Sequence, residues 1–336
     1  MRALANPDPL LRIGPYTTRN NFALAPMAGL TDVPFRAIAW EMGAGYMVSE
    51  MLGSKAALWD TGKSRARRVQ VPGVDPVAVQ IAGTEPEVMA EAARRHCDEG
   101  AQIIDLNFGC PAKKVCRKAA GSAMLADLDT MARIVEACAG AVDAPVTVKT
   151  RIGLEADDLI GLQAARAVVD AGAQMVVLHG RTRAQKFTGS ADHAPARRIT
   201  GQLSVPVLVN GDIVDAPSAA RAMSQSGADG VMIGRGAMGQ PWLFRALRGG
   251  ADLSLAEKLD VMLRHIRSTH EFYGAPQGVR IARKHIEAYI ALLLADWPAE
   301  HLRDHLRRGH RLQQPQEQLA FLAETVARLD AQDWAA

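Results

Sequence analysis

Cysteine and long apolar segments are both scarce in this sequence. Its 336 residues include four cysteines and no CxxC pair, which argues against a disulfide framework and a cysteine-based zinc site. The longest apolar stretch, Ala288–Ala295, is far too short to cross a bilayer, and the N-terminus lacks the apolar segment of a secretion signal. We therefore expect a cytoplasmic protein that needs neither disulfides nor a metal ion.

An excess of charge of one sign is lacking too. The chain has 39 Lys and Arg against 36 Asp and Glu, which gives a net charge of +3 and a pI near 8.7. That balance alone does not predict nucleic-acid binding, so such a prediction depends on how the cations are distributed along the chain. With 48% hydrophobic and 22% charged residues the chain is typical of globular proteins, and its length suits two domains or one large barrel with an appendage.

Short apolar runs recur at intervals of about 30 residues, the length of a βα unit, through the first three-quarters of the chain. Most are continuous rather than alternating, which is typical of strands buried on both faces. They predict eight strands, at Phe22–Pro26, Gly45–Ser49, Val77–Ile81, Gln102–Leu106, Val146–Lys149, Met175–Leu178, Val207–Asn210 and Gly230–Gly234. Helical stretches between them include Glu85–Glu99, Asp129–Val142, Asp158–Ala171 and Ala216–Gly227.

Eight parallel strands alternating with helices predict an α/β fold of the (β/α)8 TIM-barrel type. An open doubly wound sheet is the alternative, and the number of strands and the length favour the barrel. After about Leu253 the chain is helical with no strand between, over Leu255–Tyr273, Val279–Ala295 and Gln316–Asp330. We therefore expect a barrel domain over residues 1–250 and a small all-helical domain over residues 251–336, with Gly249-Gly250 as the hinge.

Polar residues gather where the predicted strands end. Because the active sites of TIM barrels lie at the carboxyl ends of the strands, we expect these side chains to line one mouth. At single positions the plainer explanations stay open, since Lys149 could be a solvated lysine and His179 a packing residue. The residues at the strand ends include Gln80, Asn107, Cys110, Lys149, Arg151, His179, Asn210, Asp212 and Arg235.

The loops after the seventh and eighth strands are rich in glycine, with Gly211 in one and Gly234 beside Arg235 in the other. Glycine lets backbone N–H groups approach an anion closely, so we expect a phosphorylated ligand there. Gly234–Gly239 also fits the GxGxxG dinucleotide pattern. We give that match little weight, because it follows the last strand and Pro241 comes too soon for the required helix.

Cys110 lies in a Gly-Cys-Pro segment just after the fourth strand. On its own it could be a nucleophile, a proton donor or a buried thiol. A regulatory disulfide with Cys116 is conceivable, although we expect free thiols in a reducing compartment. The same loop carries four cations, which suit either a solvated face or a polyanionic substrate: Lys113, Lys114, Arg117 and Lys118. Further basic clusters occur at residues 63–68 and 280–285.

Several of these motifs together resemble the tRNA-dihydrouridine synthases, most closely the bacterial B-type branch. Resemblance runs from about Arg12 to about Tyr289. The motifs that carry it are residues 25–36 (APMAGLTDVPFR), 105–111 (DLNFGCP), 179–183 (HGRTR), 210–212 (NGD) and 234–235 (GR). Those that point to the B type are residues 13–16 (IGPY), 110–115 (CPAKKV) and 281–285 (IARKH).

The resemblance implies an FMN-binding barrel with a helical tRNA-binding domain. NADPH would reduce the FMN, which would pass a hydride to C6 of a uridine in the tRNA D-loop, with position 17 suggested by the B-type likeness. Cys110 resembles the proton donor to C5, and Asn107 and Arg151 resemble groups near the uracil. The residues that resemble FMN contacts are Pro26, Met27, Ala28, Gln80, Lys149, His179, Asn210, Gly211, Asp212, Gly234 and Arg235.

Physical chemistry is consistent with this reading. A thiol near its ordinary pKa of about 8.5 is mostly protonated at neutral pH and can donate. The target base has to leave its stack to enter the mouth, and Lys113, Lys114, Arg117 and Lys118 would hold the backbone phosphates. We expect a monomer.

Three positions depart from the family pattern: Phe108 replaces a Met, His193 stands where an aromatic residue is usual, and Ala288 replaces a Trp. The first two are expected near the mouth and the third in the tail. Two other functions stay open. A flavin barrel could reduce a free pyrimidine instead, or the chain could be an RNA-binding protein without catalysis, which a colourless purified protein would support.

Overall fold

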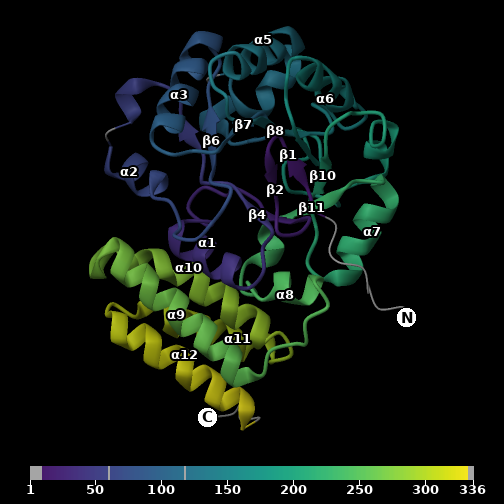
Figure 1. Ribbon diagram of the computed structural model, residues 1–336. Coiled ribbons are helices and arrows are strands. Elements are labelled where there is room, and N and C mark those ends of the chain that lie inside the picture. The colour runs from purple at the N-terminus through teal and green to yellow at the C-terminus, as the bar shows by residue number, and fades with distance from the viewer. Residues whose placement is uncertain (1–9, 60, 117–118, 332–336) are drawn as a thin grey trace. The chain divides into compact units, whose positions relative to one another are not determined.

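A computed structural model describes residues 10–331 apart from residues 60 and 117–118 (Figure 1). The chain divides into two compact units. One comprises Met1–Val33 and Ala44–Gly234, and the other comprises Pro34–Gly43 and Arg235–Ala336. Every strand of the described residues lies in the first unit, and the second is helical.

A closed ring of parallel strands forms the centre of the first unit (Figure 1). The strands are hydrogen-bonded in the order β4-β3-β11-β10-β9-β8-β7-β6-β5, and a bridge between Val48 and Ala78 closes the ring. Because β4 and β5 share the position between β3 and β6, the ring has eight positions, which confirms the predicted (β/α)8 barrel. The strands are β3 (Phe22–Leu24), β4 (Tyr46–Met47), β5 (Leu52–Gly53), β6 (Ala78–Ala82), β7 (Ile103–Asn107), β8 (Val146–Arg151), β9 (Val176–His179), β10 (Val207–Asn210) and β11 (Gly230–Ile233).

Helices follow the strands of the first unit, and the longer ones, such as α3, α5 and α6, bury apolar residues. The start of α7 shows how the sequence sets their bounds. The Asp215 carboxylate accepts from Ser218 N, and the Ser218 hydroxyl accepts from Asp215 N, a reciprocal cap that satisfies free N–H groups. The helices are α2 (Gly62–Arg68), α3 (Pro86–Asp98), α4 (Lys113–Cys116), α5 (Leu128–Ala139), α6 (Ile160–Asp170) and α7 (Ala216–Ser226), with 3-10 turns η1 (Ala56–Leu58), η2 (Gly121–Ala126) and η3 (Ala194–Arg198).

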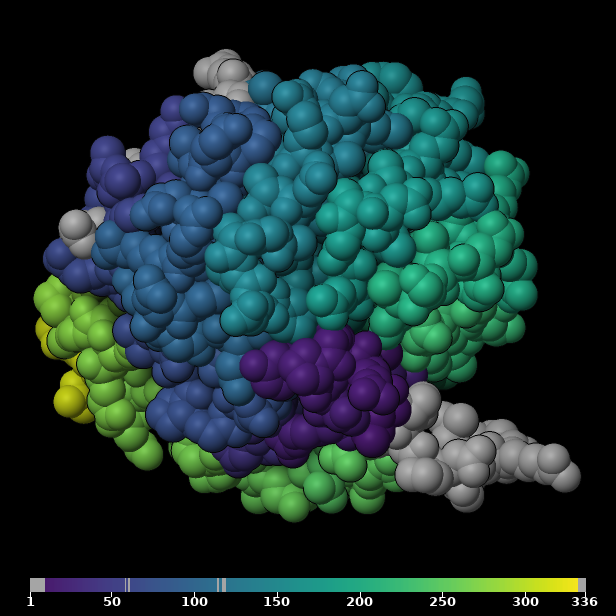
Figure 2. Space-filling view, turned by 45° about the horizontal axis from the view of Figure 1, so that its top comes forward, coloured from purple at the N-terminus to yellow at the C-terminus, as the bar shows by residue number. Residues whose placement is uncertain are grey.

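A short antiparallel hairpin, β1 (Arg12–Ile13) and β2 (Tyr16–Thr17), fills the amino end of the barrel. Leu11 and Ile13 are buried against residues near the starts of the strands, such as Ile103 and Met175. Figure 2 shows the purple N-terminal segment lying against the blue and teal segments of the barrel. An apolar plug at this end leaves the opposite end of the barrel for polar chemistry.

The second unit is built around a separate apolar core that includes Met262, Ile266, Ile286, Ile290 and Leu322. Its longest helices confirm the predicted all-helical C-terminal region. None of the described helices has both the length and the apolar composition of a membrane span. The elements are α1 (Val33–Glu41), η4 (Arg235–Ala237), α8 (Leu243–Leu247), α9 (Leu255–Tyr273), α10 (Ala275–Leu293), α11 (Ala299–Arg311) and α12 (Pro315–Asp330).

Candidate active site at the carboxyl ends of the strands

Asn210, the last residue of β10, joins the ends of two other strands. Its Oδ1 accepts hydrogen bonds from Lys149 Nζ at 2.9 Å and from His179 Nδ1 at 2.7 Å. Its Nδ2 donates to the Met232 carbonyl on β11 at 2.7 Å, which fixes the orientation of the amide. Strand register explains the cluster, because Asn210 pairs with both His179 and Met232. The structure thus brings together three of the predicted site residues.

Burial sets the charges of this cluster. Desolvation, with repulsion from Arg151, lowers the pKa of Lys149 to about 8, so the amine is still mostly a cation at neutral pH. Desolvation and the neighbouring cations lower the pKa of His179 to about 2, so its imidazole is neutral. Of these two residues, only Lys149 carries a positive charge.

The tautomer of His179 follows from its partner. Because the Asn210 oxygen only accepts, the imidazole proton lies on Nδ1, and Nε2 presents a lone pair. Nε2 is buried and has no hydrogen-bond partner among the described residues. A buried lone pair of this kind is costly unless a partner meets it, so this point of the site suits a ligand that donates a hydrogen bond.

A second polar chain runs through the barrel beneath Cys110. Gln80 Nε2 donates to Asp105 Oδ2 at 2.7 Å, and Asn107 Nδ2 donates to Gln80 Oε1 at 2.8 Å. The Asn107 oxygen in turn accepts from the backbone N–H groups of Gly109 at 3.2 Å and Cys110 at 3.0 Å. Gln80 and Asn107, both predicted from the sequence, are therefore members of one connected network.

Cys110 is half-buried in a loop that folds back on itself. Ser122 donates to the Cys110 carbonyl through both its backbone N–H and its hydroxyl, each at 3.0 Å. Gly121 has a φ of +63°, and a Cβ there would lie 2.6 Å from the same carbonyl, so only glycine fits. All four cysteines are free, and the conceivable Cys110–Cys116 disulfide is not formed. Cys116 instead lies 3.5 Å from the Cys110 carbonyl.

Arg151 ties the Cys110 loop to the loop after β9. Its guanidinium is buried and donates to the carbonyls of Gly109, Thr182 and Lys186 at 2.8 to 3.0 Å. It has no carboxylate among these partners, so a buried positive charge faces the region of Cys110. Desolvation lowers its pKa to about 10, which leaves it a cation at neutral pH.

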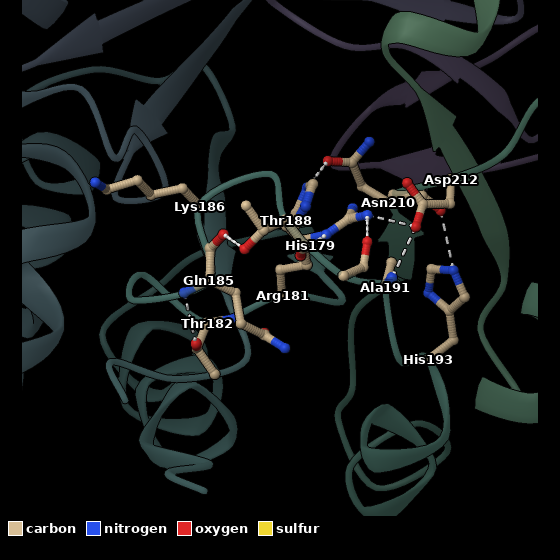
Figure 3. Close-up of polar contacts among 12 residues, drawn as sticks. His179, Arg181, Thr182, Gln185, Lys186, Thr188, Ala191, His193, Asn210 and Asp212 are labelled. Atoms are coloured by element: carbon tan, nitrogen blue, oxygen red, sulfur yellow. Dashed lines mark hydrogen bonds and ion pairs between the residues drawn. The ribbon is translucent and has the colours of Figure 1, made fainter. Parts of the chain in front are cut away.

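The turn after Asn210 has an unusual backbone held by the preceding βα loop (Figure 3). Gly211 and Asp212 both have positive φ, at +119° and +49°. Asp212 Oδ2 accepts from Arg181 Nη2 at 2.6 Å and from the Ala191 N–H at 2.8 Å, and the Gly211 carbonyl faces His193 Nε2 at 3.1 Å. These bonds oppose the strain of a left-handed turn.

Asp212, which was predicted to contact a cofactor, therefore forms an ion pair with Arg181 within the protein. Arg181 also donates to the carbonyls of Thr188 and Gly189, and its side chain is only 3% exposed. A Cβ on Gly211 would come within 2.7 Å of Ala191 Cβ and 3.5 Å of the His179 ring. The turn is thus fitted closely around the open nitrogen of His179.

Pro26, Met27 and Ala28 follow β3, on the other side of β11. The Met27 N–H donates to Thr31 Oγ1 at 2.7 Å, and a Cβ on Gly234 would lie 3.3 Å from Met27 Sδ. The loops after the first and eighth barrel strands are therefore adjacent. Arg235 opens the second compact unit, and its role stays a prediction.

The contacts of Glu50 and the exposed ring of Phe187 were not predicted from the sequence. The buried Glu50 carboxylate accepts from the Gly29 N–H at 2.5 Å and lies 3.2 Å from Arg67 Nε, so one cation of the 63–68 cluster is structural. Phe187 is an aromatic ring with 55% of its surface exposed, 5.5 Å from the Arg151 guanidinium. Its place in an Arg-rich loop after β9 was the available signal.

The predicted tRNA clamp is described only in part. Lys113 is exposed at the start of α4, while Arg117 and Lys118 lie outside the described residues, as does the side chain of Lys114. Of the departures from the family pattern, Phe108 is completely buried. His193 lies beside the Gly211 turn, where its Nε2 faces the Gly211 carbonyl.

The barrel, with its polar residues gathered at the carboxyl ends of the strands, is that of a TIM-barrel enzyme. The sequence profile of the family described as Dihydrouridine synthase (Dus) matches residues 23–329. The chain therefore belongs to the dihydrouridine synthase family, and it is an enzyme of the oxidoreductase class.

Individual relatives agree with the family assignment. The chain is 47% identical over 291 residues to tRNA-dihydrouridine synthase B of Pseudomonas aeruginosa, covering 84% of this chain and 88% of the relative. It is 49% identical to that of Xanthomonas campestris pv. campestris, covering 83% and 86%, and 46% identical to that of Escherichia coli K12, covering 83% and 89%. A solved structure of mandelate oxidase with 3,3-difluoro-2-hydroxy-3-phenylpropionic acid aligns with a TM-score of 0.48 at 19% identity, over 81% of this chain and 80% of that one.

Proposed function

We propose that this enzyme reduces one uridine of the tRNA D-loop, at position 17, to 5,6-dihydrouridine. One observation supports the proposal above all. The half-buried thiol of Cys110 follows the carboxyl end of β7, and the Lys149–Asn210–His179 cluster lies at the carboxyl ends of β8, β9 and β10. Redox chemistry on a flat base needs a proton donor and a flavin-binding cluster facing one space, and this chain supplies residues suited to both.

The residues present fit FMN. The open Nε2 of His179, the Lys149 cation and the glycine turn at Gly211 offer an acceptor, a positive charge and a close backbone approach. When bound, FMN reduced by NADPH would supply a hydride to C6 of the uracil. The proposed cofactor contacts are Pro26, Met27, Ala28, Gln80, Lys149, His179, Asn210, Gly211, Asp212, Gly234 and Arg235, with Asp212 acting through the shape of its turn.

Lys149 and Arg151 have an electrostatic role in this proposal. Addition of a hydride to an unsaturated carbonyl builds negative charge on the substrate, and a desolvated cation stabilises such charge more strongly than one in water. Arg151 and Asn107 would face the uracil, and the exposed Phe187 ring beside Arg151 offers a surface on which a base can stack.

Cys110 completes the reaction. Its thiol proton would go to C5, so that the hydride and the proton together saturate the C5–C6 bond. The thiolate left behind would take a proton from solvent before the next turnover. The backbone bonds from Asn107 and Ser122 hold the loop that carries the thiol, which supports transfer in a fixed direction.

The proposal also names the residues that bind the tRNA substrate. Lys113, Lys114, Arg117 and Lys118 would hold tRNA phosphates beside Cys110. In the helical unit, which we propose also binds tRNA, Arg303, Arg307 and Arg311 line surface hollows of about 480 and 550 Å³ on α11 and its neighbours. Arg303 and Arg311 have no ion-pair partner in the described part of the chain, so both are available to phosphates. We propose that the enzyme works as a cytoplasmic monomer.

Loss of the protein from its cells tests the proposal. We expect tRNA from a deletion strain to lack dihydrouridine at position 17, with the plasmid-borne gene restoring it. Unchanged dihydrouridine at every D-loop position in the deletion strain would contradict the proposal, and turnover of free uracil by the purified protein would favour a pyrimidine reductase instead.

A further inference from the structure

Asp105 lies inside the barrel, two residues before Asn107 on β7. The alternation of side chains along a strand puts both residues on the same inward face. Asp105 is paired in register with Gln80 on β6 and with Thr147 on β8, and it is hydrogen-bonded to both of these side chains. Only 1% of its surface is exposed, so it touches no substrate itself.

The carboxylate dictates the direction of the hydrogen-bond chain above it. An ionised carboxylate only accepts, so Gln80 has to turn its NH2 group toward Asp105. That leaves the Gln80 oxygen facing Asn107, which must present its own NH2 group there. The oxygen of Asn107 is then the atom left to accept from the Gly109 and Cys110 N–H groups.

The groups at the two ends of this hydrogen-bond chain require the same orientation of the amides between them. Backbone N–H groups at the top can only donate, and the carboxylate at the bottom can only accept, so a single orientation of the two amides satisfies every group. Gln80 and Asp105 are fully buried, and an unpaired buried donor or acceptor costs free energy. An apolar residue in place of Asp105 would leave the Gln80 NH2 group without its acceptor and release this constraint.

We propose that Asp105 is a positioning residue for Cys110, acting through the amides of Gln80 and Asn107 on the backbone N–H of the thiol-bearing residue. The role in catalysis rests on the proposed function, in which Cys110 donates a proton. The positioning itself is a property of the folded protein and is measurable without substrate.

Thr147 provides the matched control. It is as buried as Asp105 and donates to the other carboxylate oxygen at 2.6 Å, yet it has no place in the chain that leads to Cys110. Thr147→Val therefore removes a hydrogen bond to Asp105 and leaves the link from Asp105 to Cys110 intact.

The experiment measures alkylation of Cys110 by iodoacetamide in the purified holoprotein, followed by peptide mass spectrometry, for single variants and for pairs. The free energy of one buried hydrogen bond corresponds to roughly a threefold to tenfold change in the alkylation rate. We expect Asp105→Ala and Asn107→Ala each to speed the alkylation of Cys110 by about that factor. Asp105→Asn, whose oxygen still accepts from Gln80, and Thr147→Val should stay within about twofold of the wild type.

The variant that combines Asp105→Ala with Asn107→Ala tests whether Asp105 acts on Cys110 through Asn107. If Asp105 acts through Asn107, adding Asp105→Ala to Asn107→Ala changes the rate no further. Full additivity of the two effects, or an unchanged rate in Asp105→Ala, would overturn the proposal. Should Asp105→Ala not fold, Gln80→Met cuts the same chain with a side chain of similar shape, and an unchanged alkylation rate in that variant is equally decisive.

Dihydrouridine formation on tRNA is measured in parallel with the same proteins. We expect kcat to fall in Asp105→Ala with KM for tRNA unchanged, and to be restored in Asp105→Asn. If the wild type makes no dihydrouridine, the proposed function fails while the alkylation cycle still tests the positioning.

Discussion

Lys149 and Asn210 meet at 2.9 Å although they lie on β8 and β10, with β9 between them. The long lysine side chain crosses the end of β9 inside the barrel, where it shares the Asn210 oxygen with His179. One amide oxygen thereby holds a cation and a neutral imidazole side by side. Such an arrangement combines a fixed charge with an open acceptor, which are the features that the proposed cofactor site requires.

Removal of the thiol separates cofactor binding from catalysis. We expect Cys110→Ala to keep its yellow colour and to lose dihydrouridine formation by a factor of roughly 10² or more, the usual loss for an acid that acts in the transition state. Cys97→Ala on α3 is the control, since that thiol lies in a helix of the barrel wall, and it should retain wild-type turnover. Full activity in Cys110→Ala, measured by quantifying dihydrouridine, would reject the proton-donor role.

Neutralising the basic loop tests the tRNA clamp. With Lys113, Lys114, Arg117 and Lys118 replaced by Gln, tRNA binding should weaken and the slope of log K against log salt should fall by roughly 1 to 3. The exposed cations Lys63 and Arg65 on α2 serve as the comparison pair, and their replacement should change the slope little. Equal slopes for the wild type and the loop variant in a salt titration would exclude the clamp.

A single methyl group added at Gly211 is expected to weaken cofactor binding. Gly211→Ala has to place its Cβ 2.7 Å from Ala191 Cβ at a φ of +119°, so the turn beside His179 must shift. We expect FMN affinity to fall about tenfold, which corresponds to about 1.4 kcal/mol. Gly201→Ala carries the same kind of φ penalty, at +77°, with no atom within 4 Å of the new Cβ, and its FMN affinity should match the wild type. Equal FMN affinities in all three proteins, titrated by flavin fluorescence, would show that the turn does not shape the cofactor site.

Asp105 makes stability depend on pH in the direction opposite to most carboxylates. Desolvation raises its pKa from 3.8 to about 6 in the folded protein, against the lowering effect of its hydrogen bonds. Between those values the folded state binds a proton that the unfolded state has lost, so the free energy of unfolding falls as pH rises, by up to about 3 kcal/mol. Asp105→Asn lacks this component.

Urea unfolding of the two proteins at pH 4.5 and pH 7.5, without cofactor, measures the difference. We expect the stability of Asp105→Asn relative to the wild type to improve at the higher pH. Parallel pH curves for the two proteins would mean that Asp105 is not buried as a titrating carboxylate.

The strands were predictable from the sequence because continuous apolar runs such as Val207–Asn210 are buried on both faces of a parallel barrel. The polar ends were predictable for the same reason, since each run stops at a side chain that apolar packing does not explain. Lys149, His179 and Asn210 meet because eight such ends face one mouth. Their protonation states were not predictable, as these depend on burial and on neighbours from other strands.

Other features needed the three-dimensional register. Asp105 lies in a recognisable motif, but its pairing with Gln80 and Thr147 follows from how β6, β7 and β8 align. Arg181 finds Asp212 only because the loop after β9 folds onto the end of β10. The sequence reading also missed α11, in which Leu302 and Leu306 are the only large apolar residues among arginines and histidines.

Site-resolved mapping of dihydrouridine in a purified reaction tests whether this protein reduces uridine 17 of tRNA with Cys110 as the proton donor. Unmodified tRNA from the deletion strain is incubated with the purified flavoprotein and NADPH, and each D-loop uridine is read separately. We expect one dihydrouridine, at position 17, formed by the wild type and absent with Cys110→Ala. A wild-type protein that carries flavin, oxidises NADPH and leaves every tRNA uridine unreduced would contradict it.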